Sequence, residues 1–387
     1  MIRCVKNPLK ATQISEDVLQ PFLPDPEILR YRDMVDPNPT ALHELHARAE
    51  ELHLGSILVK DESTRFSLKA FKGLGGVCAV FRMICEQLQI DAGRVTLEEI
   101  RSEDVQARVR QMHFVTTTDG NHGKGVAFAA CFFGASAHVF LPKGSVEARR
   151  KAILEAGAAE AVVTDLSYDE CARYTRALSE EKGWLLCQDT AWDGYEKVPT
   201  WIMQGYTVMV QEILQQTERQ ITHVFLQSGV GSMAAAVACA LKARWRNIHI
   251  SLVEPEGACC FVPSFERGER RDATGSGVTE MAGLNCQSIS TIAWEKLKDI
   301  ADAAFEVTDD ITEEGMRLLG KPLPPDPAIV SGESGAVGMG LLSRLMQDGR
   351  YRDIREEMHL DDTSCVLLIS TEGDTDPEHY RKVIAGM

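Results

Sequence analysis

FSLKAFKGLGG, at residues 66–76, sets a lysine at the start of a glycine-punctuated apolar segment. Residues 56–60 (SILVK) form a short strand-like run and residues 61–63 (DES) are typical of a turn, so a helix is predicted to begin near Lys72. The Lys72 amine would then lie at the edge of a cleft, where it can form a Schiff base with a carbonyl cofactor. Lys69, one helical turn earlier, competes for this role, and most lysines are solvated surface charges.

The composition is that of a large, acidic, globular chain. Its 387 residues are 44% hydrophobic and 25% charged, which is ample material for a core larger than one ordinary domain, and two lobes are expected. The formal net charge of −16 argues against nucleic acid or an anionic membrane as a partner, because favourable phosphate electrostatics are missing. The longest apolar stretch, residues 125–141, is interrupted by Gly134, Ser136 and His138, so no membrane span is predicted.

Eleven cysteines without a C-x-x-C pair indicate buried thiols of a reducing cytosol, so a cytoplasmic location is expected. Residues 1–8 lack the apolar core of a secretion signal. His43 and His46 are three positions apart, but no cysteine or carboxylate pattern nearby completes a zinc site, which favours a solvated helix face. No catalytic metal is predicted.

Strand-like apolar runs alternate with helical segments, which is typical of an α/β fold with a doubly wound, mostly parallel sheet. Residues 1–80 and 190–387 are predicted to form a large domain, and residues 81–189 a smaller α/β domain. The predicted strands are 57–60, 113–117, 137–141, 161–163, 184–187, 223–227, 249–253 and 365–370. Besides the helix at Lys72, the predicted helices are 123–133, 145–156, 168–182, 232–244, 311–319 and 335–346.

Residues 228–233 (SGVGSM) form a glycine-rich loop between a predicted strand and a predicted helix. Backbone N–H groups and the helix N-terminus can converge there as a cradle for a phosphate group. An ordinary tight turn explains the glycines equally well. A dinucleotide site is a weaker interpretation: Glu254 ends the next strand as a ribose-binding acid would, but Ala234 replaces the third glycine of G-x-G-x-x-G.

A second loop, residues 118–125 (TDGNHGKG), offers hydroxyl, amide and backbone donors that can hold a substrate carboxylate. Asp119 within it has a common alternative role as the N-cap of the following helix. Asp189 ends another predicted strand, so we expect it at the carboxyl edge of a sheet, where ligand sites of open α/β folds lie. A turn or a helix cap is the alternative role for Asp189.

In this order, the loops resemble those of the fold type II pyridoxal phosphate enzymes, the family of threonine dehydratase, serine racemase, cysteine synthase and the tryptophan synthase β chain. A narrower similarity, to the diaminopropionate ammonia-lyases, extends over nearly the whole chain. The runs that carry it are AFKGLGG (70–76), TTDGNHG (117–123), QDTAWDGY (188–195), PTWIMQGY (199–206), MAGL (281–284) and STEGDTD (370–376). The glycine loops are shared across the fold type, so the runs at 188–195 and 199–206 are the specific ones.

The resemblance implies a set of residues around pyridoxal 5′-phosphate. Lys72 would bind the cofactor as an internal aldimine, with Phe71 and Asn121 in contact with it, Asn121 at the 3′-oxygen. The residues implied at the phosphate are Gly229, Val230, Gly231 and Ser232. Thr371 stands where relatives place a hydroxyl against the pyridine nitrogen, with Ser370 as the alternative. A neutral hydroxyl there leaves the nitrogen less protonated than a carboxylate would, which favours elimination over transamination.

The resemblance also implies the reaction, which is α,β-elimination of ammonia from D- and L-2,3-diaminopropionate to give pyruvate and two ammonia. Lys72 and Asp119 would take the α-proton from opposite faces, and Asp189 would bind or protonate the β-amino group. The residues implied at the substrate are Thr118, Asp119, Gly120 and Asp189. Alternatives are a threonine or serine dehydratase-like enzyme, another lyase of 3-substituted alanines, or a non-catalytic amino-acid or cofactor binding module. A homodimer is implied as well.

Overall fold

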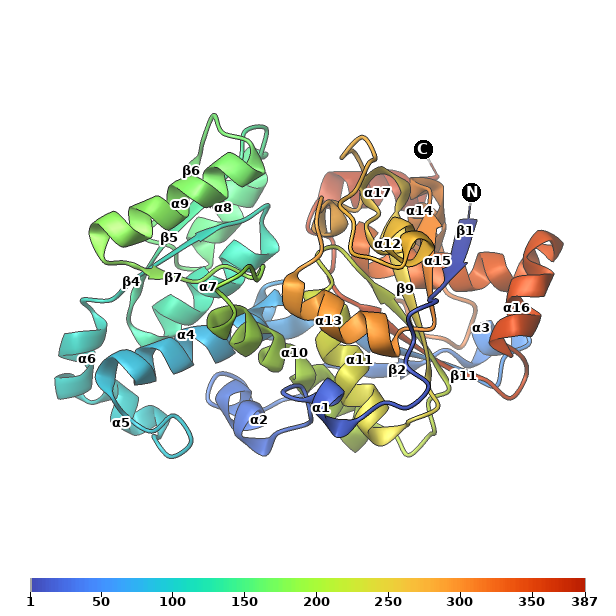
Figure 1. Cartoon of the computed structure of the whole chain (residues 1–387), viewed down its shortest axis with the longest axis horizontal. Helices are drawn as coiled ribbons and strands as arrows, with labels where there is room; N and C mark the ends of the chain where they lie inside the picture. The colour runs from blue at the N-terminus through green and yellow to red at the C-terminus, as the bar shows by residue number, and fades with distance from the viewer. Residues whose placement is uncertain (1, 387) are drawn as a thin grey trace. The chain divides into compact units, whose positions relative to one another are not determined.

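A computed structural model describes residues 2–386 and divides into two compact units. Unit 1 contains the residues up to Pro24, residues 39–70 and the residues from Met209 onward, and unit 2 contains residues 25–38 and 71–208. The chain therefore leaves unit 1 after Ala70, builds unit 2, and returns within helix α10 (Lys197–Gln216). Figure 1 labels many of the helices and strands of each unit.

Unit 1 is built on a seven-stranded sheet in the order β1-β10-β9-β8-β11-β3-β2. The interior strands are parallel and buried, whereas β1 and β2 are antiparallel strands at the edges. The predicted strands 57–60, 223–227, 249–253 and 365–370 are confirmed; β1, β2 and β10 were not predicted. The bounds are β1 Ile2–Lys6, β2 Leu42–Glu44, β3 Ser56–Asp61, β8 His223–Gln227, β9 His249–Pro255, β10 Ala303–Val307 and β11 Cys365–Ser370.

Unit 2 contains a parallel sheet of four strands in the order β6-β5-β4-β7. Helices α7 (Asn121–Phe133) and α9 (Tyr168–Lys182) pack against β4 and β5, and α4 (Lys72–Leu88) packs against α7 (Figure 1). The strand bounds are β4 His113–Thr117, β5 Ser136–Leu141, β6 Glu160–Val163 and β7 Leu185–Leu186. Every strand predicted for this region is present, which confirms the α/β class with a large and a smaller sheet.

The remaining elements cover the sheets or connect them. Those of unit 2 are α2 Pro26–Asp33, α5 Leu97–Arg101, α6 Glu103–Val109 and α8 Glu147–Glu155. The α-helices of unit 1 are α1 Glu16–Leu19, α3 His46–Glu51, α11 Ser232–Arg244, α12 Phe261–Arg267, α13 Thr291–Ile300, α14 Asp309–Gly320, α15 Glu333–Gln347, α16 Arg352–Met358 and α17 Pro377–Ala385. Its 3-10 helices are η1 Glu62–Ser67, η2 Glu256–Ala258, η3 Ala282–Leu284 and η4 Gly349–Tyr351.

The boundaries of the two units differ from the predicted domains. Residues 71–80 and 190–208, expected in the large domain, lie in unit 2, as do residues 25–38. Close packing of α4 on α10 is the physical reason, since a Cβ on Gly75 would come within 2.7 Å of the Ile202 side chain. The glycines after Lys72 thus let two helices approach each other, a contact that the motif alone did not indicate.

All eleven cysteines are free thiols, most of them buried. None of the helices built by residues 2–386 is both long and apolar enough to cross a membrane. Across the same residues, no group of three or more histidine, cysteine and carboxylate side chains is arranged to hold a metal ion.

Candidate active site

The segment that leads into Lys72 has an unusual backbone. Phe66, Ser67 and Lys69 have φ angles of +50°, +59° and +56°, in the left-handed region that non-glycine residues rarely adopt. The segment follows β3 and η1, and helix α4 begins at Lys72 as predicted. A strained conformation of this kind persists only where the surrounding structure holds it, and it is common beside functional residues.

Arg65, directly before this segment, is fixed in a buried cluster within unit 1. Its guanidinium donates to both carboxylate oxygens of Glu62, each at 2.8 Å, and to both carboxylate oxygens of Glu212, at 2.7 and 2.8 Å. Lys60 completes the cluster, with its Nζ 2.6 Å from Glu212 Oε2. Two cations and two carboxylates balance, so the buried cluster is neutral and well hydrogen-bonded. We call these four residues the Arg65 cluster.

Lys72 contacts a buried carboxylate within unit 2. Its Nζ lies 2.6 Å from Asp189 Oδ2, and the two side chains are 20% and 10% exposed. Burial alone would raise the pKa of Asp189, but the neighbouring His122 ring, the charge of Lys72 and the hydrogen bond from Lys72 outweigh it and lower the pKa to about 2. Asp189 is therefore an ionised acceptor for a cation. Lys69, the competing lysine, is half exposed and pairs with Asp374 at 2.7 Å.

Two aromatic rings lie beside the Lys72 amine. Nζ is 5.6 Å from the centre of the Phe71 ring and 6.0 Å from that of Tyr206, and the two rings meet edge to face. The Tyr206 hydroxyl is buried and has no hydrogen-bond partner among the residues that the structure describes. Tyr206 was not among the predicted site residues. Its position at the end of the 199–206 run, which carries the family resemblance, could have indicated it.

Asp119, in the loop before α7, does not cap this helix, which was the alternative role predicted for it. Thr118 Oγ1 accepts from the backbone N–H groups of Gly120 at 2.9 Å and Gly123 at 3.0 Å, so the threonine holds the turn. Gly120, with a φ of +152°, is the N-cap residue, and Asn121 is the first residue of α7. Burial raises the pKa of Asp119 to about 6; Arg149 opposes the shift and Asp189 adds to it. A carboxyl group tuned to this range suits proton transfer at neutral pH.

In unit 1, the loop of residues 228–231 places Gly231 at a φ of +87° and starts α11 at Ser232. No side chain caps this helix, so its N-terminus is of the kind that can bind an anion through backbone N–H groups. The dinucleotide interpretation is wrong, because the buried Glu254 carboxylate instead accepts the backbone N–H groups of Cys260, Phe261 and Val262 at 2.7, 2.8 and 3.0 Å.

Thr371 follows β11, the neighbour of β8 in the sheet of unit 1. Its hydroxyl oxygen accepts from Gln227 Nε2 at 3.2 Å, so its own O–H is available to a ring nitrogen. The Ser370 hydroxyl is instead buried against Ser331 Oγ at 2.8 Å. This arrangement favours Thr371 as the cofactor contact. Gln227, which also donates to the Ser334 and Ile369 carbonyls, was missed because its partners come from two distant segments.

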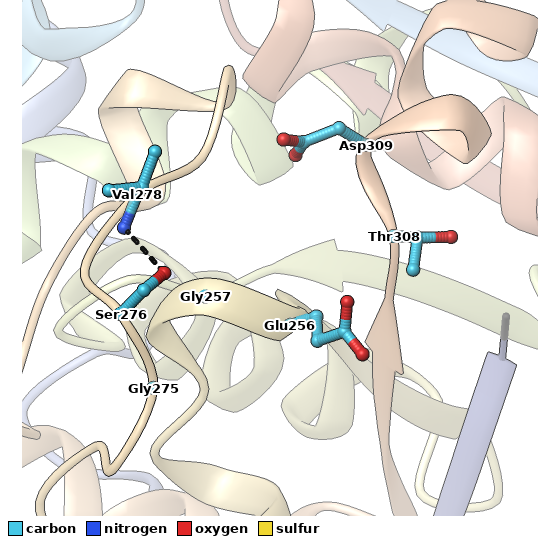
Figure 2. A pocket seen from close by; sticks show the side chains of 7 residues that line it. All are labelled: Glu256, Gly257, Gly275, Ser276, Val278, Thr308 and Asp309. Carbon is cyan, nitrogen blue, oxygen red and sulfur yellow. Dashed lines mark hydrogen bonds between the residues drawn. The ribbon is translucent and has the colours of Figure 1, made fainter.

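A pocket of about 290 Å³ lies where β9 and β10 end in unit 1 (Figure 2). It is lined by Glu256, Gly257, Gly275, Ser276, Val278, Thr308 and Asp309. Asp309 accepts from Thr279 Oγ1 at 2.6 Å and from the Glu280 backbone N–H at 3.1 Å, so it anchors the chain just before residues 281–284. The lining contains two carboxylates and no cation, so it is unsuited to a phosphate group.

Comparison with known proteins agrees with these features. Residues 35–355 match the family model described as "Pyridoxal-phosphate dependent enzyme", so the chain belongs to the pyridoxal phosphate-dependent enzymes. Backbone N–H groups at the start of α11 and the hydroxyl of Thr371 are donors of the kinds that this cofactor's phosphate and ring nitrogen require, and the Lys72 amine is a nucleophile of the kind that its carbonyl carbon requires.

More specific relatives place the chain within that class. It is 43% identical to diaminopropionate ammonia-lyase of Escherichia coli strain K12 over 351 residues, which cover 89% of this chain and 87% of the relative. The crystal structure of the Escherichia coli lyase with an aminoacrylate-PLP azomethine reaction intermediate superposes with a TM-score of 0.89 at 39% identity, covering 99% and 97% of the two chains. The same lyase with D-serine gives 0.90 at 38%, covering 99% and 97%. The chain belongs to the diaminopropionate ammonia-lyase family.

Proposed function

We propose that this protein eliminates ammonia from D- and L-2,3-diaminopropionate. One substrate molecule and one water give one pyruvate and two ammonia, so atoms balance. The observation that carries the proposal is the pair of unlike carboxylates in unit 2, Asp189 ionised beside Lys72 and Asp119 tuned to about 6. A diamino acid presents one cation for a carboxylate to bind and one α-proton for a base to remove.

Pyridoxal 5′-phosphate, when bound, delocalises the electron pair left on the α-carbon. The Ser232 cradle would hold its phosphate, the Thr371 hydroxyl its ring nitrogen, and Lys72 its carbonyl carbon, with Phe71 and Asn121 as further contacts. These residues were proposed from sequence, and their donor types and burial support the assignment.

Lys72, Asp119 and Asp189 have different roles in proton transfer and substrate binding. We propose that the neutral Lys72 amine removes the α-proton of one enantiomer and that Asp119 removes it from the other, because the pKa of about 6 leaves Asp119 ionised at neutral pH. Asp189, ionised at the same pH, binds the β-ammonium group. The β-ammonium already carries its proton, so it leaves as ammonia when the Cβ–N bond breaks and nitrogen takes the electron pair. Thr118 and Gly120 would hold the substrate carboxylate.

The test is a comparison of kcat/KM for 2-oxo acid release: pyruvate from D- and L-2,3-diaminopropionate and from L-serine, and 2-oxobutyrate from L-threonine. We expect both diaminopropionate enantiomers to be preferred. A preference for the hydroxy amino acids would instead assign the protein to the dehydratase-like alternative.

A homodimer in the cytosol is also proposed, by resemblance and from the free thiols. Light scattering of the purified chain tests the first point: a mass near twice 42.7 kDa supports it, and a monomer mass contradicts it.

A further inference from the structure

His122, the second residue of α7, is a buried histidine whose two ring nitrogens differ. Its side chain is 4% exposed, and Nε2 lies 2.8 Å from the Cys187 carbonyl oxygen. A carbonyl oxygen only accepts, so Nε2 carries the hydrogen and Nδ1 of the neutral ring is a lone pair. Nδ1 has no hydrogen-bond partner among the described residues.

The unpartnered nitrogen faces the carboxylate that contacts Lys72. His122 Nδ1 is 3.8 Å from Asp189 Oδ2, and the same oxygen is 2.6 Å from Lys72 Nζ. The Asp189 carboxylate oxygen thus lies near both Lys72 and His122, and all three residues belong to unit 2. A shift of about 1 Å would bring Nδ1 to hydrogen-bond distance from the carboxylate.

Lys72 cannot react with a carbonyl group while it is an ammonium ion, since its electron pair is occupied. We infer that His122 accepts, through Asp189, the proton that Lys72 must lose. The Nζ–H bond breaks and leaves its electron pair on Nζ, Asp189 Oδ2 passes the proton on, and a new N–H bond forms at His122 Nδ1. Asp189 ends as a carboxylate, now beside an imidazolium instead of an ammonium.

The groups facing His122 determine when the ring takes a proton. Burial lowers the pKa of His122, Asp189 opposes this shift, and Lys72 adds to it; Cys187 contributes its backbone carbonyl. While Lys72 is charged, the ring is therefore neutral. When Lys72 loses its charge, Asp189 attracts a proton to Nδ1. His122 is a positioning residue in this scheme, because it acts through Asp189.

This inference rests on the proposed function only in taking Lys72 as the reactive amine. His122→Gln is the informative variant, because the glutamine amide lies the same number of bonds from Cα as Nε2 and keeps a donor for Cys187, yet has no titrating nitrogen. His223→Gln is the matched control: this buried histidine bonds Met358 O through Nε2 at 2.9 Å, and its Nδ1 is partnered by Thr222 Oγ1 at 2.8 Å.

The primary measurement is the rate at which the cofactor-stripped full chain gains visible absorbance after pyridoxal 5′-phosphate is added, across pH. We expect His122→Gln to be slower by about 10²-fold at neutral pH and to approach the unmodified protein at high pH, where water removes the Lys72 proton. His223→Gln should match the unmodified protein. A His122→Gln profile equal to the unmodified one would overturn the inference and leave a purely structural role.

A second readout does not require cofactor or activity. In ¹⁵N NMR of histidine-labelled protein, the His122 signal, assigned from its loss in His122→Gln, should show a hydrogen on Nε2 alone. In Lys72→Ala it should protonate at Nδ1 at a higher pH, because Asp189 has lost its cation. An unchanged titration contradicts proton sharing. If Lys72→Ala instead still gains cofactor absorbance, the proposed function fails and the NMR result stands separately.

Discussion

Unit 1 and unit 2 each contain a lysine 2.6 Å from a buried carboxylate, Lys60 with Glu212 and Lys72 with Asp189. Lys60 is 0% exposed, and its three N–H donors are satisfied, because it also donates to Thr40 O at 2.8 Å and Gln216 Oε1 at 2.9 Å. Lys72 is 20% exposed, and its carboxylate faces an unpartnered histidine nitrogen. The same kind of ion pair is thus fully buried in unit 1 and partly exposed beside an unpartnered histidine nitrogen in unit 2.

The largest expected effect comes from removing the lysine of each pair. Lys72→Ala should lose the cofactor absorbance and lower kcat/KM for diaminopropionate by on the order of 10⁴-fold or more, because the reactive amine is absent. Lys60→Met should keep the absorbance in its folded fraction. Absorbance spectra and ammonia release measure both. Full ammonia release by Lys72→Ala would show that the two lysines have been assigned wrongly.

Substitution of the carboxylate in each pair should affect different properties: stability for Glu212 and activity for Asp189. Glu212→Gln leaves an uncompensated cation in a fully buried cluster, so we expect a loss of about 3–5 kcal/mol of unfolding free energy. Asp189→Asn should cost about 1 kcal/mol or less, since Lys72 reaches solvent and can shed its proton, but should lower turnover by about 10²-fold or more. Urea denaturation and kinetic assays measure these quantities. Equal losses of stability would remove the distinction between the pairs.

The contribution of Asp119 to the reaction rate should depend on pH. The ionised carboxylate is the base, so the rate with the enantiomer that depends on it should fall as pH drops through about 6. Asp119→Asn should lower kcat for that enantiomer by about 10²-fold and abolish this acidic limb, with a much smaller effect on the other enantiomer. Separate pH–rate profiles for D- and L-diaminopropionate measure this. Equal loss for both would assign Asp119 a role in binding alone.

The smallest effect is expected at a third lysine pair, which lies at the surface of unit 1. Lys69 and Asp374 are 50% and 30% exposed, so Lys69→Ala should change stability by about 0–1 kcal/mol and leave cofactor absorbance intact. Thermal melting and an absorbance spectrum are sufficient. Loss of absorbance in this variant alone would move the reactive amine from Lys72 to Lys69.

Features that depend on neighbouring residues could be predicted from the sequence. The start of α4 at Lys72 and strands β4, β8 and β11 follow from local apolar periodicity and turn residues, and they place the loops correctly at strand ends. The edge strands β1 and β2 are short and mostly half-buried, so they carry little periodic signal. Without a relative for comparison, the glycine loops alone would not have excluded a dinucleotide-binding site.

Side-chain partnerships between distant residues could not be predicted. Arg65 and Glu212 are 147 positions apart, and no local pattern shows that one clamps the other. His122 likewise lies in a motif whose glycines and asparagine carried the prediction, and its neighbour Asp189 comes from another loop. The capping role that was the alternative for Asp119 is not observed, because Gly120 is the N-cap residue and Thr118 Oγ1 accepts the N–H groups of Gly120 and Gly123.

The most direct test is to identify which lysine binds the cofactor. The protein is incubated with pyridoxal 5′-phosphate and reduced with borohydride, and the modified peptide is located by mass spectrometry. We predict a pyridoxyl group on Lys72 and none on Lys60 or Lys69. Modification of Lys60 or Lys69 in place of Lys72 would contradict the account.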